Sequence, residues 1–158
     1  MKKTVLLGLT TMFFLSLMAC KSRQPISGYY NYDTECLGKN YDGTQIVKSW
    51  GTGENRKAAE IRAYQEALQD ILFEGIRSGN SDCQSVPLIT EANAREKYRT
   101  YFNRFFSNDG LYKDFVSLAE RRGLERNNRS NFKDAYAYYV EVHIPSLRRQ
   151  LQNDNIIP

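Results

Sequence analysis

The chain has 158 residues, of which 41% are hydrophobic, 25% charged and 13% aromatic, and this composition excludes a chain that is disordered throughout. Ten glycines and four prolines are too few for a collagen-like or low-complexity protein. The net charge of +4 falls to +2 without Lys2 and Lys3, since 20 basic residues then face 18 acidic ones, and so small an excess argues against nucleic-acid binding.

The first nineteen residues predict a lipoprotein signal peptide. Lys2 and Lys3 precede an apolar stretch at residues 5–19, which is shorter than the ~20 residues needed to cross a bilayer. The sequence Leu-Met-Ala-Cys at residues 17–20 resembles the lipobox of bacterial lipoproteins. That resemblance implies that residues 1–19 are removed and that Cys20 is lipidated, with each buried methylene contributing ~0.8 kcal/mol to membrane binding. The alternative is an ordinary secretory signal followed by a chance cysteine.

The residues after Cys20 predict where the protein is delivered. Lys21 rather than aspartate follows the cysteine, and the resemblance to Gram-negative sorting rules implies delivery to the outer membrane. Acidic residues next to the anchor, which mark surface export in some lipoproteins, are missing, so we expect the periplasmic face. We expect residues 20–41 to form the lipidated cysteine and a tether, because Pro25 and a low apolar content are typical of a spacer. Residues 42–158 are then the folded domain.

Cys36 and Cys83 are the two cysteines left, and an even pair in an exported protein favours a disulfide. A rival interpretation is a catalytic cysteine working with His143, but neither residue lies in a recognisable nucleophile motif. One histidine and two distant cysteines also lack the paired ligand spacing of structural zinc. We therefore expect no metal and no cofactor.

The first half of the remaining chain predicts a strand followed by a long helix. Residues 43–51 read as a strand because β-tolerant residues lie between glycine-containing turn signals. Residues 55–77 predict an amphipathic helix that ends at Gly79 and the polar residues after it. Its alanines would allow close packing on a sheet, and they are Ala58, Ala59, Ala63 and Ala67. Residues 86–89 are expected to form an edge strand, since Pro87 removes one amide donor.

The second half predicts two further helical regions and a strand. A helix is expected over 91–107, and helical spacing of apolar residues continues over 111–123. Residues 121–133 are polar and predict an exposed loop. Strict alternation over 136–144 predicts a strand with one buried face, and Ser146 is expected to cap a last short helix. The predicted fold is α+β, with a small antiparallel or mixed sheet of about three strands packed by two or three helices.

The order of these elements resembles a known envelope domain. A strand, Trp-Gly-Thr-Gly at 50–53, an alanine-rich helix, a helical middle, a long strand and Pro-Ser-Leu-Arg at 145–148 resemble the N-terminal domain of flagellar assembly protein T and related outer-membrane lipoproteins. The resemblance covers most of residues 42–155 and implies no catalytic residues. The aromatic spacing of Phe102, Phe105 and Phe106 with Tyr112 and Phe115 resembles uncharacterised lipoproteins of gut-type Gram-negative bacteria. One identity that this resemblance implies is the lipoprotein subunit of a divergent type VI secretion envelope complex.

Two groups of residues are candidate partner-binding residues. Tyr29, Tyr30 and Tyr32 lie beyond a flexible spacer and predict a binding strip, which would act by strand addition or by sugar stacking. The alternative is that they pack on the edge of their own domain. Arg126 and Arg129 belong to the polar loop and would contact lipid head groups, peptidoglycan or an acidic partner, or else stay solvated.

These observations favour a lipid-anchored, non-enzymatic structural or assembly subunit of an envelope-spanning complex, such as a secretion apparatus, that docks through protein–protein contacts. The alternative is a periplasmic binding module for cell-wall glycan or peptide. A hydrolase is least favoured, because the chain offers no convergent acid, base or nucleophile beyond scattered carboxylates. The expected partners are outer-membrane lipid, through Cys20, and proteins of the complex, with no nucleic acid.

Overall fold

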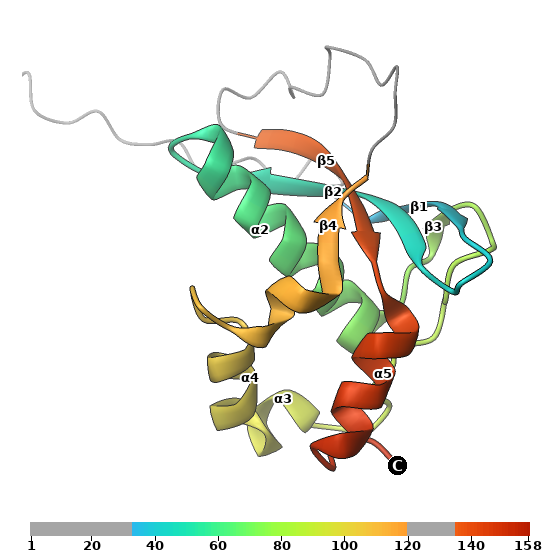
Figure 1. Cartoon of the computed structure of the whole chain (residues 1–158), viewed down its shortest axis with the longest axis vertical. Coiled ribbons are helices and arrows are strands. Elements are labelled where there is room, and N and C mark those ends of the chain that lie inside the picture. The colour runs from blue at the N-terminus through green and yellow to red at the C-terminus, as the bar shows by residue number, and fades with distance from the viewer. Residues whose placement is uncertain (1–32, 120–134) are drawn as a thin grey trace, which may run out of the picture. The chain divides into compact units, whose positions relative to one another are not determined.

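The computed structural model describes residues 33–119 and 135–158, and both ranges belong to one compact unit. Its centre is a single five-stranded sheet in the order β3-β1-β2-β5-β4 (Figure 1). The strands are β1 (Glu35–Lys39), β2 (Gln45–Thr52), β3 (Ser78–Gly79), β4 (Val116–Leu118) and β5 (Ala135–Val142). The sheet is mixed, because β1 and β3 are parallel whereas the other neighbouring strands are antiparallel.

Helices cover one face and one end of this sheet. α2 packs against β2 and β5, and α3, α4 and α5 lie together beyond the sheet in the lower half of Figure 1. The helical segments are α2 (Arg56–Gln69), the π-helical turn η2 (Asp70–Glu74), α3 (Ala94–Lys97), α4 (Arg99–Phe105), the 3-10 segment η3 (Leu111–Phe115) and α5 (Ile144–Asn153). The predicted α+β class is confirmed.

The number of strands was underestimated, since the sheet has five strands and not about three. β3 has two residues and β4 has three, which is too short for an alternating pattern to be recognised. β1 lies within the residues expected to form the tether, yet it pairs with β2 over Glu35 to Lys39. The folded domain therefore begins before residue 42, because β2 needs β1 to satisfy its backbone hydrogen bonds on that side.

The contact between α2 and the sheet is close because both surfaces carry small side chains. Asn55 caps the helix by accepting a hydrogen bond from the Ala58 amide at 2.9 Å. Of the four alanines expected to pack closely, Ala59, Ala63 and Ala67 are fully buried, whereas Ala58 is half-buried. The helix packs on β2 and β5. A Cβ atom at Gly51 would lie 1.8 Å from the Ala59 carbonyl oxygen, so only glycine fits there.

The end of the long helix differs from the prediction. The helix stops at Gly75, whose φ of 77° suits glycine, rather than continuing to residue 77 and Gly79. Residues 86–89 form no strand; instead the amides of Leu88 and Ile89 donate to the carbonyls of Ile71 and Leu72 at 3.0 and 2.9 Å. This segment therefore satisfies carbonyl groups that the helix end leaves open.

The middle of the chain is helical only in part. The helix expected over 91–107 is present as α3 and α4, with a break at Tyr98. Helical spacing over 111–123 was misread, because η3 covers five residues and β4 follows it directly. Leu118 is accordingly exposed at the sheet edge. The predicted loop at 121–133 lies entirely outside the described residues.

β5 and α5 are the predicted closing strand and helix, but the expectation of one buried face is wrong for β5, because Ala135 and Ala137 are buried on the face opposite Val140 and Val142. Val140 and Val142 are fully buried on the face that α2 covers, and Leu147 and Leu151 are buried on α5. Ser146 does not cap this helix, since α5 already begins at Ile144, with Pro145 in its first turn.

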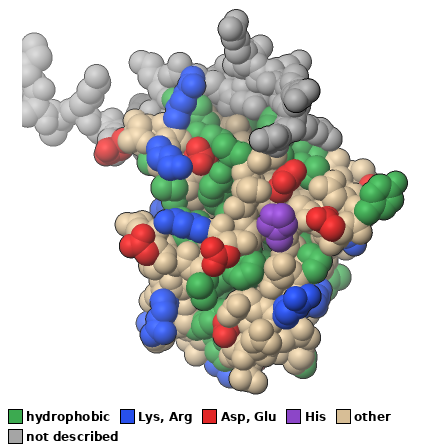
Figure 2. All heavy atoms as spheres, in the orientation of Figure 1, with side chains coloured by type: hydrophobic (Ala, Val, Ile, Leu, Met, Phe, Trp, Pro, Cys, Tyr) green, Lys and Arg blue, Asp and Glu red, His purple; other side chains and the backbone are tan. Residues whose placement is uncertain are grey.

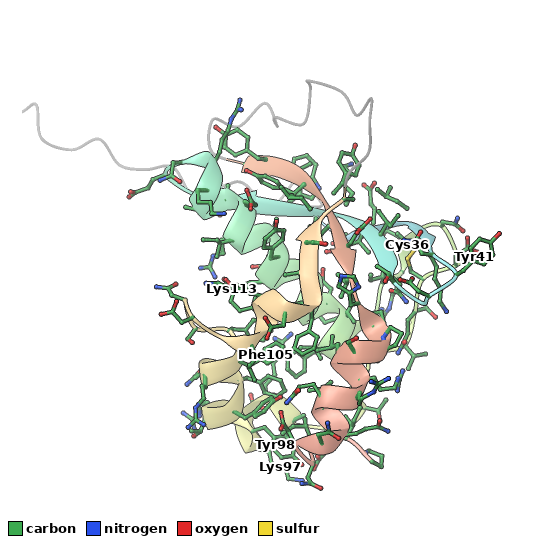
Figure 3. The ribbon with its side chains drawn as sticks, in the orientation of Figure 1. Cys36, Tyr41, Lys97, Tyr98, Phe105 and Lys113 are labelled. Carbon is green, nitrogen blue, oxygen red and sulfur yellow. A yellow bond between two sulfur atoms is a disulfide. The ribbon has the colours of Figure 1, made fainter. Side chains whose placement is uncertain are left out.

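The predicted disulfide between Cys36 and Cys83 is present, and it joins β1 to the segment after β3 (Figure 3). The two cysteines are 47 positions apart in the sequence, and closing a loop of that length stabilises the fold by about 4 kcal/mol in the chain-entropy model. It therefore holds the short edge of the sheet, where β3 contributes two residues to the pairing.

We expect Gly51→Ala to lower the free energy of unfolding by about 1–3 kcal/mol or more, because the new methyl group collides with the backbone of α2. Urea unfolding of the full chain measures this change. Thr52→Ala, at the exposed neighbouring position, is the control and should stay within about 0.5 kcal/mol of the wild type. Equal stability of the two variants would contradict the close contact.

Candidate functional site

A groove between α2 and the α3–α4 region is the candidate site, and we call it the arginine groove. It has a volume of about 400 Å³ and is lined by side chains from α2, η2, α3, α4 and the residue after α4. Its aromatic lining residues are Phe73, Phe102 and Phe106. The ring centres of Phe73 and Phe102 are 4.9 Å apart in an edge-to-face arrangement, which couples the end of the long helix to α4.

The aromatic lining is rigid because it continues into the core. Phe105 on α4 is buried and stacks on Phe115 with ring centres 6.0 Å apart, and Figure 3 shows Phe105 among the side chains between the helices. Tyr101 packs on the Phe102 edge and donates its hydroxyl hydrogen bond to Asp154 at 2.7 Å. Burial, together with Asp154, raises the pKa of Tyr101, so it stays a neutral donor at physiological pH. α4 is thereby tied to the end of α5.

Three arginines line the groove, and they are Arg62 from α2, Arg95 from α3 and Arg99 from α4. Arg95 lies over the Phe73 ring, 4.5 Å from its centre, and pairs with Glu74 at 3.2 Å. Arg99 makes no ion pair within the described residues. Because none of the described lining residues is a carboxylate, the groove carries an excess of positive charge.

Amide side chains supply the remaining polar groups of the groove. Gln65 donates to the Phe106 carbonyl at 3.0 Å and accepts from Arg62 at 3.4 Å, so it connects α2 to the end of α4. Gln69 and Asn103 line the groove on opposite walls. An amide offers a donor and an acceptor together, which is the pattern needed to bind a peptide backbone.

A second pocket of about 490 Å³ shares Phe73 with the arginine groove and has a mainly acidic lining. Its lining includes Asp33, Asp70 and Glu74, with Arg77 as the basic residue. Burial raises the pKa of Asp70, the hydroxyl of Thr34 opposes this by donating to its carboxylate, and nearby acids raise it further. Among residues 33–119 and 135–158, no cluster of histidine, cysteine, aspartate or glutamate is arranged to hold a metal.

His143 belongs to a network of hydrogen-bonded side chains next to the start of β2 and the end of β5. Its Nδ1 lies 3.1 Å from the Thr44 hydroxyl, which in turn lies 3.0 Å from Asp42. Hydrogen bonds from Thr44 lower the pKa of Asp42. Figure 2 shows this single histidine at the surface beside acidic side chains. The rival interpretation of a catalytic cysteine with His143 is wrong, because the thiols of Cys36 and Cys83 form the disulfide.

The sequence-predicted site residues fall into two groups. Cys36 and Cys83 lie at the edge of the sheet, away from the lining of the arginine groove. The lipidation residue, the three tyrosines and the two loop arginines lie outside the described residues, and they are Cys20, Tyr29, Tyr30, Tyr32, Arg126 and Arg129. The roles assigned to this second group therefore remain predictions from the sequence.

Sequence reasoning missed the three arginines of the groove. Arg62, Gln65 and Gln69 lie on the polar face of the predicted amphipathic helix, which is the usual property of an exposed surface. Arg95 and Arg99 are four residues apart, a spacing that places them near one another if the chain is helical there. The sequence does not reveal that α4 packs beside α2. That packing brings the polar residues of α2 close to Arg95 and Arg99.

No family model, curated protein or solved structure matches the chain. Within the described part of the chain, no helix has the length and apolar character required to cross a membrane. The functional assignment therefore depends on the geometry and chemistry of the groove and on the residues of the sequence.

The acidic pocket gives a prediction about pH. Because the pKa of Asp70 is raised in the folded state, its ionised form destabilises the domain above that pKa, and this effect disappears as the pH falls toward the unfolded value. We therefore expect Asp70→Asn to be more stable than the wild type at neutral pH, with the difference shrinking on acidification. Urea unfolding over a pH series measures it.

The control for this series is Asp114→Asn, which removes an exposed carboxylate from η3. Asp114→Asn should not show the higher stability at neutral pH that we expect of Asp70→Asn. A pH-independent difference for Asp70→Asn would contradict the assignment.

Proposed function

We propose that the chain is a lipid-anchored, non-enzymatic assembly subunit of an envelope-spanning complex, held on the periplasmic face of the outer membrane. The observation that carries this proposal is the arginine groove, which combines cationic, amide and aromatic side chains on a rigid support. Aromatic residues and arginine are the residue types in which the binding energy of protein interfaces is concentrated. A docking role needs such a surface and no reactive group.

Two features support export and anchoring. The Cys36–Cys83 disulfide is typical of proteins that fold in an oxidising compartment such as the periplasm. The lipobox-like sequence ending at Cys20 supplies an acylation site ahead of the folded domain. Together they support a domain tethered to a membrane and facing the periplasm.

The non-enzymatic assignment is supported by the polar chemistry of the described residues. His143 lies within hydrogen-bond distance of Thr44, with Asp42 beyond it, and the two cysteines of the described residues, Cys36 and Cys83, are joined in the disulfide. The acidic pocket around Asp70 includes no histidine and no cysteine among its lining residues. A general acid–base or nucleophilic mechanism would need such groups to converge on one substrate position.

The order of elements supports a relationship to envelope domains. β2, the glycine turn at 51–53 and α2, followed later by β5 and α5, keep the arrangement on which the resemblance to flagellar assembly protein T was based. We propose that the chain serves in a secretion apparatus of the cell envelope. One candidate for its identity is the lipoprotein subunit of a divergent type VI secretion envelope complex. The alternative, a binding module for cell-wall glycan or peptide, uses the same anchor with a different partner.

We expect Cys20→Ala to release the protein from the membrane fraction, because it removes the proposed acylation site and the apolar run at 5–19 is too short to span. Fractionation followed by mass spectrometry of the N-terminal peptide measures both location and acylation. Cys20→Ala protein that still sediments with the outer membrane would overturn the lipoprotein proposal.

Co-purification after mild solubilisation tests the assembly role. The tagged full chain should retain a small set of envelope proteins at constant ratios. We expect the recovery of these proteins to fall severalfold when Tyr29, Tyr30 and Tyr32 are replaced together by alanine. We expect a similar fall when Arg126 and Arg129 are replaced together by serine. Unchanged recovery in both variants would remove these residues from the interface. Retention of cell-wall fragments without proteins would favour the alternative, and turnover of a cell-wall substrate would overturn the non-enzymatic assignment.

A further inference from the structure

We propose that the arginine groove binds an extended, acidic peptide segment of a partner protein. This inference deepens the proposed assembly function and rests on it, since it names the chemistry of the segment that docks. It is carried by the length of the groove, its charge and the way its aromatic rings are covered.

The groove is elongated along the long helix. Arg62, Gln65, Gln69 and Phe73 recur at spacings of three and four residues, so they share one face of α2 and η2. From the first to the last this face spans about 16 Å, because each helical residue rises ~1.5 Å. An extended peptide advances ~3.3 Å per residue, so about five residues would match that length. A lone phosphate or carboxylate would occupy only a small part of it.

The charges lie on opposite walls of the groove. Arg62 is exposed on α2 and Arg99 is exposed on α4, whereas Arg95 is partly neutralised by Glu74. Each guanidinium can bind a carboxylate through two parallel hydrogen bonds. Arg62 also lines a neighbouring pocket together with Glu66, so replacing Arg62 would change the charge of two pockets. Replacing Arg99 avoids this, because Arg99 does not line that neighbouring pocket.

The aromatic rings favour a peptide over a sugar. Sugar binding to aromatic residues uses an open ring face, but the Phe73 ring is covered by the Arg95 guanidinium at 4.5 Å and contacts Phe102 through an edge. Phe102 and Phe106 are themselves stacked, with ring centres 6.4 Å apart. The three rings therefore offer apolar surface that an aliphatic side chain of a peptide can contact. Gln69 and Asn103 also line the groove, and each amide offers a donor and an acceptor for the backbone groups of a peptide.

The test uses the full chain and a defined probe. A blocked six-residue peptide that alternates glutamate and leucine should bind in a fluorescence anisotropy titration, and the same peptide with glutamine for glutamate should bind about tenfold more weakly or not at all. Binding of the acidic peptide should also weaken as salt is raised.

Matched variants locate the site. We expect Arg99→Glu to weaken binding of the acidic peptide about tenfold, and Arg99→Lys to restore part of it. Arg104→Glu is the control: it lies exposed on the same helix, outside the groove lining, and makes the same change in net charge. Circular dichroism and thermal unfolding should show all three variants folded as the wild type.

The possible outcomes distinguish failure of the peptide-binding inference from failure of the proposed assembly function. Equal binding by Arg99→Glu and Arg104→Glu, or no binding of the acidic peptide, overturns the inference even if envelope proteins still co-purify. Tighter binding of muropeptides, or of vesicles containing phosphatidylglycerol, than of the acidic peptide also overturns it and identifies a glycan or a lipid surface as the occupant. Loss of co-purifying proteins from the wild type would instead remove the assembly function itself.

Discussion

The close approach of α2 to β2 is the contact on which the rest of the domain depends. Gly51 leaves no side chain between the strand and the Ala59 carbonyl, and Ala63 and Ala67 continue the same narrow face along the helix. The burial of small side chains contributes modest hydrophobic energy per residue, so the stability of this contact comes from dense packing over its whole length. A larger side chain at Gly51 would move the helix away from the sheet, and the elements beyond it would lose their support.

The position of the arginine groove follows from that contact. Because one face of α2 is used by the sheet, its polar face is left toward α4, and the π-helical turn carries the chain on to Gly75 with Phe73 directed at Phe102. The helix end is then held by the amides of Leu88 and Ile89, which donate to carbonyls of the last turn. The walls of the groove therefore belong to elements fixed by the core and not to loops.

Much of the fold was predictable from the sequence because its longest elements have strong periodicity. The alternation in β5 and the alanine face of α2 were both readable, and the even pair of cysteines in an exported chain indicated the disulfide. The misread parts were those decided by tertiary contacts. β1 and β3 are too short and too polar to be recognised without their partner strands. The π-helical turn η2 that follows α2 ends at Gly75, where a Cβ would meet the Ser85 carbonyl at 2.0 Å. The groove was not predictable because Arg62 and Arg99 come from helices whose packing the sequence does not reveal.

Crosslinking from inside the arginine groove, on the intact membrane, tests most directly whether a partner protein lies there. A photoreactive amino acid at Asn103, which lines the groove, would be compared with one at Arg149, which is exposed on α5 outside it. We expect one protein adduct from position 103, with the crosslinked peptide rich in glutamate or aspartate, and no such adduct from position 149. Identical adducts from both positions, or a crosslinked segment without acidic residues, would contradict this expectation.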